Sequence, residues 1–222
     1  MVTDADGKEL MRQVGAPFST PAEATEWFKK TGEALENVDK LEAAHKEKPE
    51  DAATTLDLAK TYSQLGKSEE SLKLYEELVP TLKKEDKQYV DAKLGYADAL
   101  TGTITRANQK EVGDKISGIY DEILPGLVKA KDDRAVDPTI LNCRIKSMLN
   151  KKHEDARKDI KALIEAFPKM ERLTEAKFWA AYFAQSNGDD ETAKTEYKSI
   201  VDEGPEDDTW VKNAQGQLDK ME

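Results

Sequence analysis

Apolar residues recur every three or four positions along most of the chain, which is the spacing of a helix that buries one face. This spacing predicts one helix over residues 52–65 and a return helix over residues 68–79, separated by Gly66. The apolar stripes of the two helices consist of Leu58, Ala59, Tyr62 and Leu65, and of Leu72, Tyr75 and Leu78. The same pattern returns over residues 174–201, with Gly188 at the turn. The chain is therefore predicted to be built from helix pairs.

One segment of the return helix recurs along the chain. Residues 74–80, Leu-Tyr-Glu-Glu-Leu-Val-Pro, match the chemical character of residues 119–125, Ile-Tyr-Asp-Glu-Ile-Leu-Pro, at every position. Related segments occur at residues 160–168 and 197–205. Successive copies are 45, 40 and 37 residues apart, which approaches the ~34-residue period of a helix-pair repeat with insertions.

These segments resemble the tetratricopeptide repeat (TPR), which has a small residue at the helix crossing, a glycine at the turn, alanine and then an aromatic residue on the second helix, and a final proline. The matching residues are Ala59, Gly66, Ser71 and Tyr75 in the first repeat, Ala97 and Tyr120 in the second, Ala156, Ile160 and Pro168 in the third, and Ala181, Gly188, Ala193, Tyr197 and Pro205 in the fourth. Lys151 replaces the turn glycine of the third repeat, and the second carries an insertion at residues 102–110. The resemblance implies an all-α helix-pair solenoid over residues 33–207.

The two ends of the chain do not fit the repeat. Residues 208–222 predict a helix that caps the solenoid, with Trp210, Ala214 and Leu218 at helical spacing. At the other end, Asp6-Gly7 predicts a tight turn between two short strands, and a helix is expected to begin after Thr20. Residues 1–32 resemble the closing hairpin and helix of a thioredoxin-like domain, so we expect a short N-terminal β-hairpin. The half of such a domain that carries a Cys-x-x-Cys site would then be absent from this chain.

The composition bears on the kind of partner. The chain has 222 residues, a net charge of −11 and a pI of about 4.9. An acidic surface repels phosphate groups, which disfavours nucleic acid and anionic membranes as partners. The chain contains no apolar run of the ~18 residues that a membrane span needs, and no signal-peptide core. We therefore expect a cytoplasmic protein.

Residues that could support catalysis or metal binding are few. Cys143 is the single cysteine, and its position on a repeat helix favours a buried structural role. The two histidines, His45 and His153, fall in different repeats, so a histidine-based metal site is disfavoured. No phosphate-binding glycine motif or nucleophile elbow is present. We expect no catalytic site, no cofactor and no metal.

The TPR resemblance implies a concave groove lined by outward positions of the first helix of each repeat. Aligned on the repeats, these positions are Leu56, Lys60, Gln64, Leu94, Asp98, Leu141, Ile145, Met148, Phe178, Tyr182 and Gln185. The second half of the set is apolar and aromatic, which suits an amphipathic helix or an extended peptide, with Phe178 and Tyr182 as anchors. Alternatively, some of these residues pack under the C-terminal helix or under the insertion at residues 102–110.

Three functions remain open from the sequence. The first is a non-catalytic scaffold that binds another protein or peptide in this groove. The second is the C-terminal repeat portion of a thioredoxin-like oxidoreductase. The third is a self-associating structural module, in which the end helix of one chain docks on another.

Overall fold

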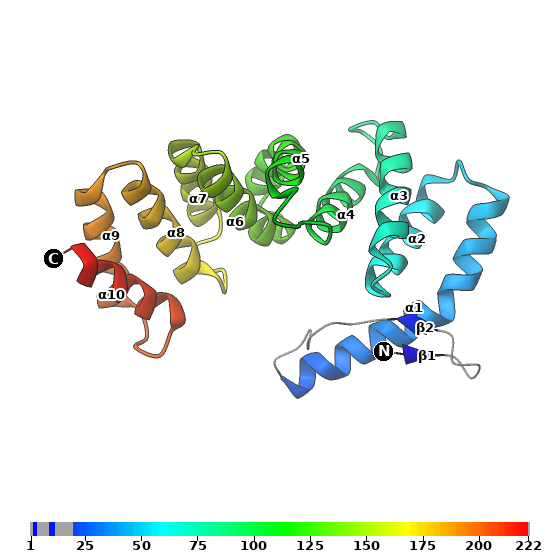
Figure 1. The fold of residues 1–222 in the computed structure, drawn as a ribbon, viewed down its shortest axis with the longest axis horizontal. Helices are drawn as coiled ribbons and strands as arrows, with labels where there is room; N and C mark the ends of the chain where they lie inside the picture. The colour runs from blue at the N-terminus through cyan, green and yellow to red at the C-terminus, as the bar shows by residue number, and fades with distance from the viewer. Residues whose placement is uncertain (1, 4–8, 12–19, 222) are drawn as a thin grey trace. The chain divides into compact units, whose positions relative to one another are not determined.

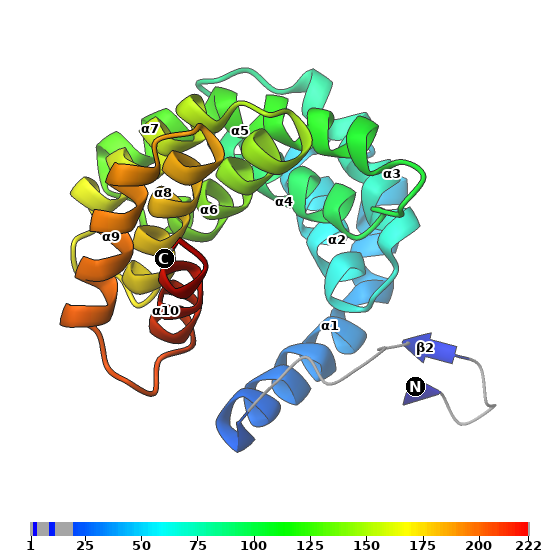
Figure 2. The same cartoon turned by 60° about the vertical axis from the view of Figure 1, so that its left-hand side comes forward.

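The computed structural model describes residues 2–3, 9–11 and 20–221, and their architecture is one of helices joined by short loops (Figures 1 and 2). The chain divides into two compact units, residues 1–106 and 107–222. Each unit has its own apolar core. The boundary falls in the loop between α4 and α5, which is where the sequence places an insertion.

Four α-helices build the described part of the first unit. They are α1 (Pro21–Glu47), α2 (Ala52–Gln64), α3 (Ser68–Leu78) and α4 (Tyr89–Thr101), with a 3₁₀ turn η1 (Val79–Thr81) after α3. Each helix packs on the next in the chain. The side chains that form the centre of this core are Ala34, Val38, Leu56, Leu58, Ala59, Leu65, Leu74, Tyr75, Leu78, Ala92 and Ala99. The predicted first helix pair, α2 and α3, is therefore confirmed.

Small residues bring α2 and α3 close together. Ala59 and Ser71 are both fully buried, and the Ser71 hydroxyl donates a hydrogen bond to the Ala59 carbonyl oxygen at 2.8 Å. A larger side chain at either position would push the helices beyond the ~8–10 Å of close packing. The small residues that suggested the TPR resemblance thus lie at the helix crossing.

The second unit continues the pattern of helix pairs. Its elements are α5 (Gln109–Ala130), a 3₁₀ turn η2 (Asp133–Ala135), α6 (Val136–Arg144), a π-helical turn η3 (Ile145–Leu149), α7 (His153–Ala166), α8 (Leu173–Ser186), α9 (Asp190–Glu203) and α10 (Thr209–Met221). The pairs are α6 with α7 and α8 with α9, and α10 packs on α9 and α8. The predicted C-terminal helix is therefore present, and Val211 and Ala214 bury its inner face.

Left-handed backbone conformations end the first helix of three pairs. Gly66 has a φ of 71° and Gly188 a φ of 83°, a region that glycine enters without steric cost. Lys151 has a φ of 57° at the equivalent turn after η3. The third repeat thus keeps the turn conformation although its sequence lacks the glycine.

The helix predicted to begin after Thr20 is confirmed. The Thr20 side chain accepts a hydrogen bond from the Glu23 backbone N–H, and the Glu23 carboxylate accepts one from the Thr20 N–H, both at 3.2 Å. Pro21 occupies the first turn, where no N–H is needed. This helix runs unbroken to Glu47.

The prediction of a β-hairpin as part of the fold is wrong, because both apolar cores are built by the helices and the architecture is helical. The described N-terminal residues form only two extended pieces, β1 (Val2–Thr3) and β2 (Glu9–Met11), which pair antiparallel with a shift in register. A regular strand keeps one register, and strands usually have five or six residues. The expected turn at residues 4–8 lies outside the described residues. The resemblance of residues 1–32 to a thioredoxin-like domain relied on the hairpin and gains no support.

A membrane span requires a helix of about 20 predominantly apolar residues. None of the helices within residues 20–221 combines the length and the apolar composition needed to cross a bilayer.

Candidate functional site

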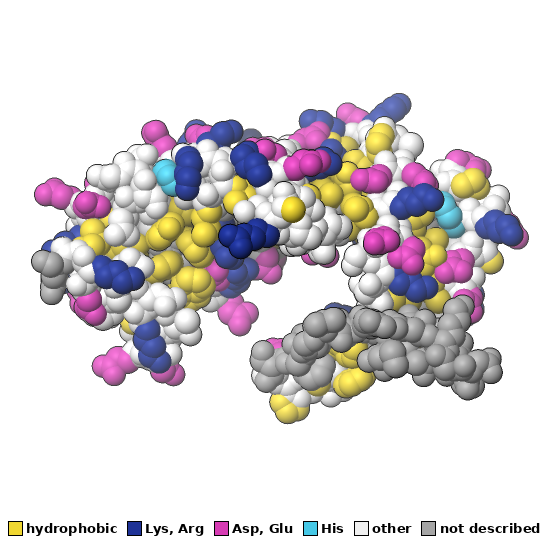
Figure 3. All heavy atoms as spheres, viewed as in Figure 1, with side chains coloured by type: hydrophobic (Ala, Val, Ile, Leu, Met, Phe, Trp, Pro, Cys, Tyr) yellow, Lys and Arg dark blue, Asp and Glu magenta, His cyan; other side chains and the backbone are white. Residues whose placement is uncertain are grey.

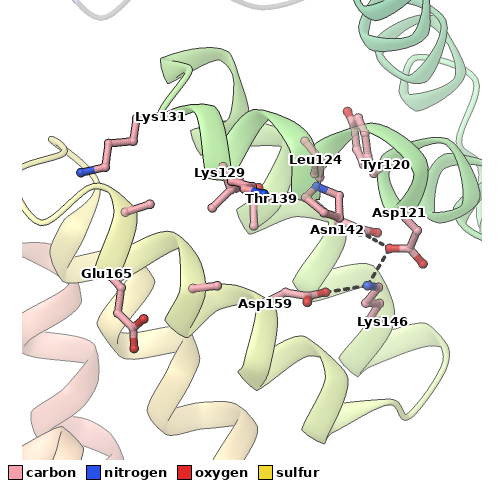
Figure 4. A pocket seen from close by; sticks show the side chains of 14 residues that line it. Tyr120, Asp121, Leu124, Lys129, Lys131, Thr139, Asn142, Lys146, Asp159 and Glu165 are labelled. Carbon is pink, nitrogen blue, oxygen red and sulfur yellow. Dashed lines mark hydrogen bonds and ion pairs between the residues drawn. The ribbon is translucent and has the colours of Figure 1, made fainter. Parts of the chain in front are cut away.

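A pocket of about 620 Å³ lies between α5, α6 and α7 in the second unit (Figure 4). Its size falls within the ~300–1,000 Å³ of small-ligand sites. The aliphatic part of its lining consists of Leu124, Pro125, Val128, Ala162 and Ala166. The other lining residues are Tyr120, Asp121, Lys129, Lys131, Thr139, Asn142, Lys146, Asp159 and Glu165. The pocket therefore combines an apolar wall with several charged groups.

Lys146 is the centre of the charged group. Its Nζ lies 2.6 Å from a carboxylate oxygen of Asp121 on α5 and 2.6 Å from one of Asp159 on α7. The Asn142 amide donates a further hydrogen bond to Asp121 at 2.8 Å. The Lys146 side chain is only 11% exposed, whereas those of Asp121 and Asp159 are 47% and 40% exposed. The three helices are thus linked through one lysine.

The electrostatics of Lys146 follow from this geometry. Burial alone would lower its pKa, but the hydrogen bonds to Asp121 and Asp159 outweigh burial, so its pKa is raised above the ordinary value. Lys146 therefore stays charged at neutral pH. Because two carboxylates face one ammonium group, the cluster carries one net negative charge.

The helical geometry places three polar side chains on one face. Thr139, Asn142 and Lys146 follow one another at spacings of three and four residues, which is the repeat of a helix face. Lys146 lies in the π-helical turn η3, a wider turn that occurs often at functional sites in proteins. In Figure 4 Thr139 and Asn142 precede Lys146 along this face, and Lys146 forms the ion pairs with Asp121 and Asp159.

Two buried polar atoms at this pocket have no hydrogen-bond partner among the described residues. They are the Thr139 hydroxyl oxygen and the Asn142 side-chain carbonyl oxygen, on residues that are each 3% exposed. An unsatisfied buried polar atom costs about 1–3 kcal/mol, and such atoms are rare in folded proteins. Both residues line the pocket.

The cysteine and the two histidines each have their own local environment. Cys143 is fully buried in the second core, and burial raises the pKa of its thiol well above the usual range. His45 contacts the Thr55 hydroxyl at 3.1 Å, and His153 contacts the Ser147 hydroxyl at 2.8 Å. Among the described residues, no three His, Cys, Asp or Glu side chains are grouped as metal ligands would be.

In the first unit, the predicted groove residues have different environments. Leu56 is 4% exposed and belongs to the core. Lys60 and Gln64 line a second pocket, of about 580 Å³, between α1 and α2. Lys60 also forms an ion pair with Asp91 at 2.8 Å. The two predicted residues on α4 are the half-buried Leu94 and the exposed Asp98.

In the second unit, two predicted groove residues lie in the core. Ile145 is 6% and Phe178 is 4% exposed. The Phe178 ring packs against Trp210 of α10, with ring centroids 5.1 Å apart, so Phe178 lies under the C-terminal helix. Met148, by contrast, is 47% exposed. The remaining members, all half-buried, are Leu141, Tyr182 and Gln185.

Apolar side chains reach the surface of this unit over α6 and α8 (Figure 3). These are the two first helices whose outward positions were expected to line the groove. The groove as a binding site remains a prediction.

Sequence reasoning missed the pocket between α5, α6 and α7. It considered only the outward positions of first helices, whereas this pocket is lined by the second helices α5 and α7 together with α6. A signal was present: Asn142 and Lys146 are polar residues four apart on a helix that is otherwise mostly apolar.

Comparison with known proteins supports the fold. No protein-family model matches the chain, and no curated protein sequence matches it. Two solved structures of TPR-like repeats from a candidate kinesin light chain of Podosopora anserina are similar to it in structure. The first, a single-substitution variant of that protein, shares 17% identity at a TM-score of 0.56, covering 80% of this chain and 90% of that one. The second shares 16% identity at a TM-score of 0.51, covering 76% and 83%. The chain therefore has a TPR-like fold.

Proposed function

We propose that this TPR-like chain is a non-catalytic scaffold that binds a segment of another protein on the outward face of α6 and α8. The exposure of Met148 carries the proposal. It is one of three large hydrophobic side chains in the described residues that are at least 40% exposed, and it alone of the three lies at this face, in the turn η3 that continues α6. Unbranched, polarizable methionine side chains adapt well to apolar partners.

The neighbouring positions support a peptide-sized partner. Leu141 lies seven residues before Met148, two turns earlier on the same helical segment. Tyr182 and Gln185 are half-buried on α8 and add an aromatic surface and a polar amide. Such a set suits the apolar face of an amphipathic helix or the alternate side chains of an extended segment. The net charge of −11 favours a segment with basic residues at its edges.

The oxidoreductase alternative is not proposed, because it depended on a thioredoxin-like N-terminus, and the described residues 2–3 and 9–11 form only a short pairing with a shift in register. No observation on the described residues favours self-association over the binding of another protein.

The test is a pair of matched substitutions, Met148→Glu and Ile104→Glu. Ile104 is 40% exposed in the loop after α4, so both changes add one charge to an exposed apolar position. A partner captured with the unchanged chain is produced separately, and its affinity for each variant is measured by calorimetry. Met148→Glu is expected to weaken binding at least ~10-fold, because a charge enters an apolar interface.

The control Ile104→Glu should keep the affinity of the unchanged chain, and both variants should unfold at the same temperature as the unchanged chain. Equal affinities for the two variants would exclude the face of α6 and α8 as the binding surface.

A further inference from the structure

We propose that the pocket between α5, α6 and α7 binds a guanidinium group carried on an aliphatic stem, as in an arginine side chain. The proposal concerns a different surface from that of Met148 and does not rest on the proposed function. It is carried by the polar cluster of Thr139, Asn142, Lys146 and the two aspartates, and by the apolar wall beside it.

The unsatisfied atoms at the polar end of the pocket are oxygens that can accept a hydrogen bond from a ligand. The side-chain carbonyl oxygen of Asn142 accepts no hydrogen bond from the part of the chain that the structure describes, while its amide nitrogen already donates to Asp121. The Thr139 hydroxyl oxygen is equally without a partner. An N–H group would satisfy the Asn142 oxygen, and it would give the Thr139 oxygen a donor as well.

The charges at this end favour a cation. Lys146 faces Asp121 and Asp159, so the cluster has one uncompensated negative charge. Both carboxylates remain 40% or more exposed, which leaves their outer sides accessible, whereas the lysine is nearly buried between them. An anion would have to approach these carboxylates and is disfavoured.

The charges at the other end do not cancel this preference. Lys131 and Glu165 lie at the opposite end of the pocket from Asp121 and Lys146 (Figure 4). Their opposite signs balance each other, and Lys129, the remaining charged residue of the lining, makes the lining neutral as a whole, so the negative charge is local to the end at Asp121 and Asp159. A ligand cation is therefore attracted to the end that holds Asp121 and Asp159.

The wall between the two ends suits a hydrocarbon stem. Leu124, Val128 and Ala162 come from α5 and α7 and present aliphatic surface to the pocket. An arginine stem can cover such a surface while its head reaches the polar end. Guanidinium is preferred over ammonium because it is more weakly hydrated and offers five N–H donors in a planar fork.

The first test compares two blocked amino acids of nearly identical shape. The full chain, labelled with ¹⁵N, is titrated with N-acetyl-arginine methylamide and with the citrulline analogue, which replaces the guanidinium by a neutral urea. Arginine should shift the amide resonances of α5, α6 and α7, and citrulline should bind at least ~10-fold more weakly, because charge-assisted hydrogen bonds are about twice as strong as neutral ones. Equal binding of the two, or shifts confined to other helices, would overturn the proposal.

Two further probes distinguish the source of the group. Butylguanidine carries the head and the stem without a backbone, and a blocked pentapeptide with a central arginine carries flanking residues. Similar affinity for both would identify a small guanidine-bearing molecule as sufficient. Clearly tighter binding of the peptide would identify an arginine of a protein segment.

Two variants test the residues themselves. Thr139→Val removes an unsatisfied buried hydroxyl, so it should raise the unfolding temperature while weakening arginine binding. A purely structural threonine would change stability without changing the affinity.

Asp159→Asn should weaken arginine binding at least ~10-fold. Asp155→Asn, on the same helix but outside the pocket lining, should leave binding unchanged. Unchanged binding in both pocket variants would refute the assignment.

Discussion

The ring of Tyr75 in α3 lies directly against the backbone of Gly95 in α4. A β-carbon at residue 95 would lie 2.2 Å from the Tyr75 hydroxyl oxygen and 2.5 Å from the ring carbon that bears it. Tyr75 is only 1% exposed, so the ring is held by the surrounding core. The contact explains why a glycine stands in the middle of α4.

Replacing Gly95 by alanine should therefore destabilise the first unit. Alanine favours a helix interior by about 0.5–1 kcal/mol over glycine, but overpacking a tight core costs about 1–3 kcal/mol. We expect a net loss of about 1–2 kcal/mol in the free energy of unfolding, measured by urea denaturation. Gly118→Ala on α5 is the control, because no atom beyond its chain neighbours and the nearby backbone of its own helix lies within 4 Å of its β-carbon position. That change should stabilise the protein, and a stabilising Gly95→Ala would contradict the steric account.

Helix pairs were predictable because the apolar spacing and the turn glycines act locally. Gly66 and Gly188 adopt the left-handed conformation that their positions in the pattern required. The hairpin prediction failed as an element of the fold because an Asp-Gly pair signals a turn but does not supply the partners that a stable sheet needs.

The groove residues could be predicted less well, for reasons of tertiary packing. Phe178 was assigned to an open groove, yet α10 folds over it and Trp210 contacts its ring. Helical periodicity gives the spacing of a face but not what will cover that face. The pocket at Lys146 requires Asp121 and Asp159, residues 38 apart on two helices, to meet at one point, and that meeting depends on the packing of three helices.

Replacing Lys151 by glycine should stabilise the second unit. Lys151 has a φ of 57°, where a side chain costs about 1 kcal/mol that glycine avoids. The greater freedom of glycine in the unfolded chain offsets part of this gain. The expected net increase in the free energy of unfolding is therefore at most about 1 kcal/mol. The control Lys158→Gly, within α7, should instead destabilise by about 1 kcal/mol. No gain for Lys151→Gly would show that the turn is relaxed with lysine in place.

The ion pair between Arg157 on α7 and Glu196 on α9 should make the stability of the second unit depend on pH. The two guanidinium nitrogens donate to the two carboxylate oxygens at 2.8 and 2.9 Å. Burial would raise the pKa of Glu196, but the hydrogen bonds from Arg157 and Lys161 outweigh it, so the pKa is lowered. A lowered pKa stabilises the fold above the ordinary value of about 4.5, and this stabilisation is lost as the pH falls through the folded-state pKa.

Glu196→Gln tests this dependence. At pH 7 the variant should be less stable by about 1–3 kcal/mol, because both side chains are less than a third exposed and charged hydrogen bonds are lost. The difference from the unchanged chain should shrink as the pH falls below ~4.5. Glu191→Gln, at an exposed position of the same helix, should show no such loss. A difference that is constant with pH would contradict the assignment to the Glu196 carboxylate.

Cys143 should report on the opening of the second core. Its side chain is fully buried in the core of the second unit, and burial, with Asp159 nearby, raises the pKa of the thiol. Because the thiolate is the reactive form, the folded protein should react with a disulfide reagent at pH 8 at least ~100-fold more slowly than the protein unfolded in guanidinium chloride. Labelling in the folded state then requires an opening reaction, and its rate should fall as stability rises. Thr139→Val, expected to stabilise this unit, should therefore slow the labelling of Cys143. Rapid labelling of the unchanged chain would show that α6 opens without global unfolding, and it would count against a rigid pocket at Lys146.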